Sequence, residues 1–169
     1  MKIAWHDMVI QTKDNNLAEL DSKLQQFVER HHFFSLHDLT DNFQAVIAES
    51  NIRNGFLKAQ SHHTTAVLSI NELDEPMLVM DIQRVLEAMV PKVQDYLHNS
   101  KLRTKNLCAE DNKCDRNADA HIKSYLSGGP TISMLVRDGK LVLGKWQRVA
   151  LIDYDGPRER NITVQIMGE

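Results

Sequence analysis

The sequence HHTTAVLSINE, residues 62–72, is the stretch that decides how the chain folds, because it begins polar, becomes apolar and ends in a carboxylate. Side chains of a strand alternate between its two faces. The even-numbered residues from Ala66 to Ile70 should therefore share one face, and the odd-numbered residues from Thr65 to Asn71 should share the other with His63. A buried imidazole needs a hydrogen-bond partner for each ring nitrogen. The stretch predicts a buried strand that carries chemistry, and a histidine bonded to a backbone carbonyl at a strand end is the plainer alternative.

Length and charge limit the class of protein. The 169 residues and 19.4 kDa fit one domain, residues 1–169. A net charge of -3 provides no basic surface for nucleic acid. No window approaches the roughly 20 apolar residues of a membrane-spanning helix, and the first residues lack the apolar segment of a secretory signal. We therefore expect a cytoplasmic protein with no nucleic-acid partner and no membrane partner.

The chain before residue 62 predicts one edge strand and two helices. Residues 3–12 fit an edge strand, and residues 16–30 carry apolar side chains at helical spacing. A second helix should begin near Asp38 and end between Asn51 and Gly55. A further strand should then lead into the histidines.

The chain after residue 72 predicts two helices separated by a loop. Asp74 should cap a helix that ends at Val90, and Asn117 should cap another. Residues 99–116 are polar and irregular, which indicates an exposed loop. The side chains expected to face the core from these helices are Leu78, Ile82, Val85, Leu86, Met89, Ile122, Tyr125 and Leu126.

The remaining sequence predicts strands joined by short turns. Asp138-Gly139 is a strong hairpin signal, and residues 155–158 form another turn before a strand with alternating apolar residues at 162–166. These connections are too short for helical crossovers. The expected fold class is α+β, a single domain with mixed or antiparallel β-sheets and packed helices.

Six short motifs occur in one order along the chain. They are HTTA at 63–66, INE at 70–72, Tyr96-x-His98, ADAHIK at 118–123, LG-x-WQ at 143–147 and DGPR at 155–158. In this order and spacing the chain resembles the YjbQ-like family of small bacterial and archaeal proteins, from about Leu39 to Glu169. Each motif alone is weak, but six in order make a specific match.

The resemblance implies several properties. It implies an α+β fold, a homotrimer, a histidine-rich metal-binding pocket and a weak thiamine phosphate synthase activity. Relative to typical members, the helix at 16–30 is an insertion and the loop at 99–116 is longer. Residues 127–130, SGGP, replace the usual Leu-Gly-x-Ser element. Because this change removes a hydroxyl and a backbone donor, it affects the implied substrate more than the implied fold or metal site.

Three histidines are the candidate metal ligands. His63, His98 and His121 lie on a predicted strand, a loop and a helix start, so only tertiary folding could bring them together. Three neutral imidazoles with an open fourth position form the usual catalytic zinc arrangement. We therefore predict a divalent metal ion as cofactor, with zinc as the expected ion.

Four charged residues are candidates for the remaining chemistry. Glu72 and Arg158 are predicted to be catalytic, with Glu72 as general base, and Lys123 and Arg158 are predicted to bind a phosphorylated ligand. Asp119 could orient a ligating histidine. Three of them have a structural alternative: Glu72 and Asp119 suit helix starts, and Arg158 could pair with a neighbouring carboxylate.

Two hypotheses of function follow. The first is a metal-dependent enzyme that acts on a phosphorylated small molecule, with a thiamine phosphate synthase-like transferase as the form that the resemblance implies. The second is a non-catalytic trimeric protein that binds a metal or ligand. A pocket shared by the histidines, Glu72 and Arg158 would favour the enzyme.

Overall fold

The computed structural model describes residues 1–13, 34–105 and 116–169 of the chain. The helix predicted at 16–30 lies outside the described residues, as do positions 106–115 of the predicted loop. Among the described residues, no helix is long and apolar enough to cross a lipid bilayer.

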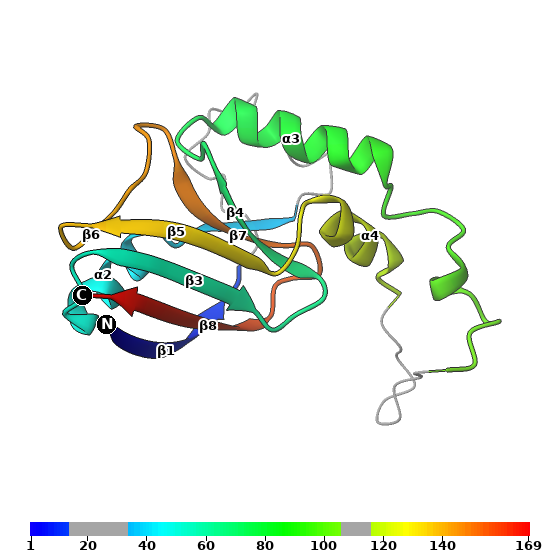
Figure 1. The fold of residues 1–169 in the computed structure, drawn as a ribbon. Helices are drawn as coiled ribbons and strands as arrows, with labels where there is room; N and C mark the ends of the chain where they lie inside the picture. Colours follow the sequence, from blue (N-terminus) through cyan, green and yellow to red (C-terminus); the bar gives the residue numbers. More distant parts are fainter. Residues whose placement is uncertain (14–33, 106–115) are drawn as a thin grey trace.

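Two antiparallel sheets and three α-helices make up the described chain (Figure 1). One sheet has the strand order β1-β8-β3-β5-β6 and the other β2-β7-β4, and every recorded pairing is antiparallel. The α+β prediction is confirmed, in its antiparallel form. The elements are β1 (Lys2–Gln11), β2 (Ser35–Asp38), α2 (Thr40–Ser50), β3 (Gly55–Ser61), β4 (Ala66–Asn71), α3 (Pro76–Met89), the 3₁₀ helix η1 (Leu97–Asn99), α4 (Ala118–Leu126), β5 (Thr131–Arg137), β6 (Lys140–Leu141), β7 (Arg148–Asp153) and β8 (Glu159–Gly168).

The main core lies between the two sheets and is completed by α2. Leu57 and Val164 of the five-stranded sheet, Leu68 and Leu151 of the three-stranded sheet, and Phe43 of α2 belong to one buried cluster. A smaller cluster lies on the other face of the three-stranded sheet, beside α3 and α4. The three-stranded sheet is thus covered on both faces, as Figure 1 shows.

The predicted alternation in β4 is confirmed and explains this layering. Ala66 and Leu68 face the main core, whereas Val67 faces the smaller cluster. A strand buried on both faces is apolar at consecutive positions. The histidines, however, are not part of the strand: residues 62–65 form the turn between β3 and β4.

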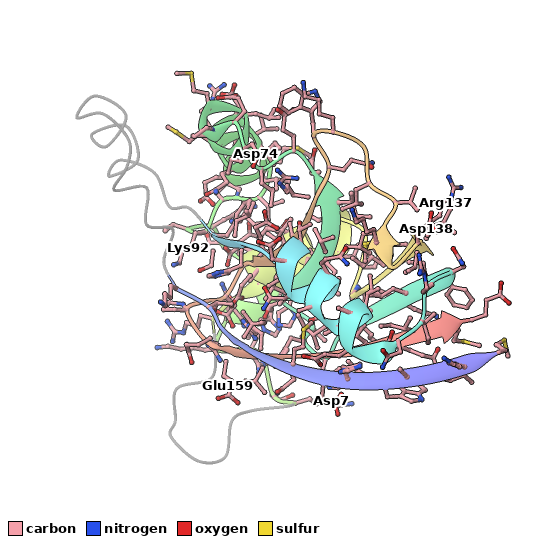
Figure 2. The ribbon with its side chains drawn as sticks, turned by 90° about the vertical axis from the view of Figure 1, so that its left-hand side faces the viewer. Asp7, Asp74, Lys92, Arg137, Asp138 and Glu159 are labelled. Carbon is pink, nitrogen blue, oxygen red and sulfur yellow. The ribbon has the colours of Figure 1, made fainter. Side chains whose placement is uncertain are left out.

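The predicted turns and edge strand are also present. β1 is the outer strand of the five-stranded sheet. Asp138 and Gly139 both have positive φ, 52° and 76°, as a type I′ hairpin turn requires. Figure 2 shows Asp138 beside Arg137 at this hairpin.

Three predictions about the helices were wrong. Glu75, not Asp74, caps α3: its carboxylate accepts hydrogen bonds from the backbone N–H groups of Met77 and Leu78. Asp74 instead pairs with Arg148 of the neighbouring β7, at 2.9 Å. Glu75 has an extended backbone directly before Pro76, so the cap lies one residue later than predicted.

The inward face of α3 is the second correction. Val85 and Met89 were expected to face the core, but they are 51% and 64% exposed, and the helix buries Val79, Met80 and Gln83 instead.

The inward face of α4 is the third correction. Ile122, Tyr125 and Leu126 were expected to be buried, but they are 37%, 89% and 54% exposed. Lys123 is buried instead, because its ammonium lies between Glu87 of α3 and Asp119, at 2.6 and 3.1 Å. An ion-paired lysine can thus occupy the inner face that periodicity assigned to apolar residues. The outer face of the helix is left apolar.

Candidate functional site

His98 and His121, distant in sequence, are in contact at the amino end of α4. Their rings meet edge to face, with centroids 5.3 Å apart and an interplanar angle of 67°. The short helix η1 carries His98, and Asn99 ties it to α4 because its side-chain oxygen accepts a hydrogen bond from the backbone N–H of Ala118, at 3.1 Å. The amide thus also satisfies one of the unpaired donors at the start of that helix. Two of the three predicted metal ligands are brought together.

A chain of polar contacts extends from His98 to Arg158. The Nδ2 of Asn117 donates to Oδ2 of Asp155 at 2.9 Å, and this turns the Oδ1 of Asn117 towards Nε2 of His98, at 3.3 Å. Arg158 contacts the same Asp155 carboxylate at 3.2 Å and donates through Nε to the backbone carbonyl of Asp155 at 2.9 Å. Arg158 is therefore linked to the histidines, and it also makes the structural ion pair that the sequence left open.

Arg103 approaches the same histidine from the loop after η1. Its Nη1 lies 3.2 Å from Nε2 of His98 and donates to the backbone carbonyl of that residue at 3.4 Å. Nε2 can accept from Arg103 or donate to Asn117, but a single ring nitrogen cannot do both. An open hollow of about 460 Å³ adjoins these groups, and its lining includes His98, Arg103 and Lys105. Two cationic side chains on its wall suit an anionic ligand.

His63, the third predicted ligand, makes a different contact. Its Nε2 accepts a hydrogen bond from the backbone N–H of Asn161 at 2.8 Å. Burial lowers the pKa of His63, and the nearby Arg160 guanidinium lowers this pKa further. A neutral ring that accepts through Nε2 carries its proton on Nδ1, so neither nitrogen offers a free lone pair. Within residues 1–13, 34–105 and 116–169, no three His, Cys, Asp or Glu side chains are grouped to hold a metal.

Glu72 lies at the opposite end of β4 from the turn that carries His63. Asn71 pairs with Arg148, whereas Ala66 pairs with Asp153, two residues before Asp155. A six-residue strand spans roughly 20 Å, so Glu72 is separated from the histidine pair by about that length. Glu72 lines a small, largely apolar cavity under α3. The position of Glu72 within one chain does not support the general-base prediction.

Lys123 does not line the site either. Its side chain is only 6% exposed and its ammonium is held by two carboxylates, so it is poorly placed to bind a phosphate from the solvent. Asp119 is buried with it and contacts Lys123 rather than a histidine. The phosphate-binding prediction for Lys123 and the orienting prediction for Asp119 find no support in this geometry.

Three residues of the site were missed as functional candidates: Asn117, Asp155 and Arg103. Asn117 was predicted as a helix cap at a possible phosphate-binding helix start, and Asp155 as a turn residue that could pair with Arg158. The available signal was that Asp155 and Arg158 belong to one four-residue motif. Arg103 had no signal, because it is one of several charges in a polar loop.

Comparisons with known proteins identify the family. Residues 25–169 match the family model described as UPF0047 protein YjbQ-like. A UPF0047 protein of Methanothermobacter thermautotrophicus is 37% identical over 134 residues, which cover 79% of this chain and 83% of that relative. The chain therefore belongs to the UPF0047, or YjbQ-like, family, an uncharacterised family.

Solved structures agree with this assignment. A YbjQ-like protein of unknown function from Sulfolobus solfataricus has a TM-score of 0.73 at 30% identity, with 99% of both chains covered. An uncharacterised YjbQ/UPF0047 protein from Clostridium acetobutylicum has a TM-score of 0.72 at 27% identity, with 96% of this chain and 99% of that chain covered. The fold is thus shared along nearly the whole chain.

Proposed function

We infer that the protein is a metal-dependent enzyme that acts on a phosphorylated small molecule. The observation that carries this proposal is the contact between His98 and His121 beside two arginines, because it joins potential metal donors to potential phosphate donors. A transferase resembling thiamine phosphate synthase is the specific form that the family resemblance suggests.

The donor set fits a divalent metal in part. Imidazole nitrogens are ordinary zinc ligands, and His98 and His121 would provide two of them. A bound ion would polarise a phosphate or acidify a water molecule. Asp155 would orient His98 through Asn117, in the way that outer carboxylates fix ligating histidines. Arg158 and Arg103 would bind the phosphate oxygens.

His98 and His121 provide two ligands, so a third ligand has to come from another part of the protein or from another subunit. His63 is the predicted residue, and its ring is bonded to Asn161 in this chain. We propose that a homotrimer supplies it, with His63 of the partner subunit completing the set once its Nε2 exchanges the hydrogen bond from the Asn161 backbone N–H for the metal. This assembly would also place the site between subunits, where small-molecule sites are common.

The second candidate function is metal or ligand binding without turnover. It is favoured by one observation: Glu72, the predicted general base, lies at the far end of β4 from the histidine pair. A site without a base can still bind its ligand. The replaced element at residues 127–130 agrees with this candidate.

Zinc titration by calorimetry, together with metal analysis of the purified protein, tests the site. His63→Ala, His98→Ala and His121→Ala should each weaken binding at least about tenfold, and Asp155→Ala should weaken it about tenfold. His62→Ala is the matched control, because its ring contacts Thr163 instead. Affinity should also fall below about pH 6, as imidazoles with reference pKa near 6.5 take up protons.

Turnover then separates the two candidates. The protein is incubated with a thiazole phosphate and a pyrimidine pyrophosphate, and thiamine phosphate is measured by chromatography; other phosphorylated heterocycles are screened in the same way. Turnover that disappears in His98→Ala supports the enzyme. Zinc binding without turnover supports the second candidate. Unchanged zinc affinity in His98→Ala and His121→Ala would reject the proposed site.

A further inference from the structure

The outer face of the five-stranded sheet carries ordered rows of side chains away from the proposed site. Trp5, Gln165 and Lys58 lie side by side across β1, β8 and β3, because Trp5 pairs with Gln165 and Gln165 with Lys58. Asp7 and Thr163 begin the next row. Figure 2 shows Asp7 and Glu159 at the boundary of the molecule on this side. This face is opposite the core, and α3 and α4 cover the other sheet.

A hollow of about 290 Å³ opens in this face. Its walls include Trp5, Lys58, Gln60, His62, Thr163 and Gln165. The volume is close to the lower end of the range for small-ligand pockets. Trp5 is 64% exposed, so a large apolar ring forms part of a wall that is otherwise polar. A second aromatic ring that stacks on this exposed indole would interact with it favourably.

A hydrogen-bond chain fixes the chemical character of His62. Thr163 donates its hydroxyl proton to Oδ1 of Asp7 at 2.6 Å, because a carboxylate only accepts. The same hydroxyl oxygen, 2.9 Å from Nε2 of His62, must then accept from that nitrogen. The neutral ring is left with its lone pair on Nδ1. His62 thus provides a defined acceptor, while its neighbours Gln60 and Gln165 provide amide donors.

Lys58 adds a positive charge to the wall of the hollow. Within the described part of the chain, its ammonium has no recorded ion pair or hydrogen bond, unlike Lys123. Adjacent strands are about 4.8 Å apart, so the backbones at Trp5 and Lys58 are separated by about 10 Å across β8. This span matches a heterocyclic ring that carries an acidic group.

The geometry points to a second binding site on this face, for a planar aromatic heterocycle that bears a phosphate or carboxylate group. The ring stacks on Trp5, the acidic group contacts Lys58, and a ring N–H or amino group donates to Nδ1 of His62. This site is separate from the histidine pair and does not depend on metal binding there.

Fluorescence quenching of Trp5 tests the proposal. Trp146→Phe leaves Trp5 as the single tryptophan of the 169-residue chain. The probes are adenosine 5′-monophosphate and 6-aminonicotinate, each of which has an amino group that can donate to His62. Adenosine tests the ring without the charge, and ribose 5-phosphate tests the charge without the ring. Saturable quenching by either acidic heterocycle supports the site, and the one that binds more tightly shows whether phosphate or carboxylate is preferred. Adenosine and ribose 5-phosphate should bind at least about fivefold more weakly than adenosine 5′-monophosphate.

Matched variants locate the binding. Lys58→Met and Thr163→Val should each raise the dissociation constant about fivefold, whereas Lys140→Met, on the same sheet but outside the hollow, should not. Equal effects of Lys58→Met and Lys140→Met would overturn the proposal, as would the absence of quenching by both acidic probes. Trp5 emission that iodide cannot quench would also overturn it, because it would mean that another copy of the chain covers this face.

Discussion

At the residue scale, the buried ion pair of Asp153 and Arg160 is held by several hydrogen bonds. Two guanidinium nitrogens of Arg160 donate to the two carboxylate oxygens, at 2.8 and 2.5 Å. The Thr12 hydroxyl donates to the same carboxylate at 2.8 Å. Asp153 is fully buried and Arg160 is 4% exposed. If either side chain were removed, water could not reach the other one to replace the lost ion pair. This pair holds the start of β8 against the end of β7, beside the turn that carries Asp155 and Arg158.

Removing one member of this pair should be costly. Arg160→Ala would leave a buried, unpaired carboxylate, so the free energy of unfolding should fall by about 3 to 5 kcal/mol. Chemical denaturation at neutral pH measures the change. Arg53→Ala is the matched control: Arg53 pairs with Asp138 with both side chains 73% exposed, and its loss should cost less than about 1 kcal/mol. Equal losses in the two variants would contradict the argument.

At the element scale, the helices show how neighbouring contacts select a cap and a face. The sequence contains two acidic residues before Pro76, and either could cap α3 by type alone. The Arg148 side chain of β7 attracts Asp74, and Glu75 is left to bond the first backbone N–H groups. In α4, Glu87 of the neighbouring helix selects the lysine face for burial. Both outcomes depend on a partner from another element.

The cap assignment predicts a difference between the two acidic residues. Glu75→Ala removes the acceptor of two backbone N–H groups and should lower the free energy of unfolding by about 1 kcal/mol. Asp74→Ala removes only a partly exposed ion pair and should cost less than about 0.5 kcal/mol. Thermal and chemical unfolding of both variants measure the difference. A larger loss in Asp74→Ala would show that Asp74 is the effective cap.

At the scale of the whole molecule, the helical layer exposes apolar side chains on its outer side. Val85 and Met89 of α3 and Ile122, Tyr125 and Leu126 of α4 are each more than a third exposed. Exposed apolar surface of this kind is typical of interfaces between proteins. It supports the proposal that the chain forms a homotrimer, with the helical layer as a contact surface.

Light scattering measures the assembly. The expected mass is three times 19.4 kDa, and Tyr125→Glu should shift the mass towards that of the monomer, because it buries a charge in the interface. Since Tyr125 is 89% exposed within one chain, this change should leave the fold of the monomer intact. Asn42→Glu, on the exposed side of α2, is the control and should leave the mass unchanged. A wild-type monomer at micromolar concentration would contradict the proposal.

The sequence by itself determined the local elements of this protein. The period-two alternation defined β4 and β8, Asp138-Gly139 defined a hairpin, and motif order defined the family. These features depend on backbone geometry and on neighbours a few residues away, so they can be read from nearby residues. The same signals also gave the α+β class with mixed or antiparallel sheets, because short connections exclude helical crossovers. The structure selected the antiparallel form.

Only the tertiary structure decided which charged and polar residues meet. It joined His98 to His121 and Asp155 to Asn117, placed Glu72 a strand length away, and buried Lys123 between two carboxylates. A histidine or lysine has the same local signal whether it binds a ligand, pairs with a carboxylate or accepts a backbone N–H. Its role depends on the groups that other elements bring within about 4 Å, and sequence spacing carries no information about that distance.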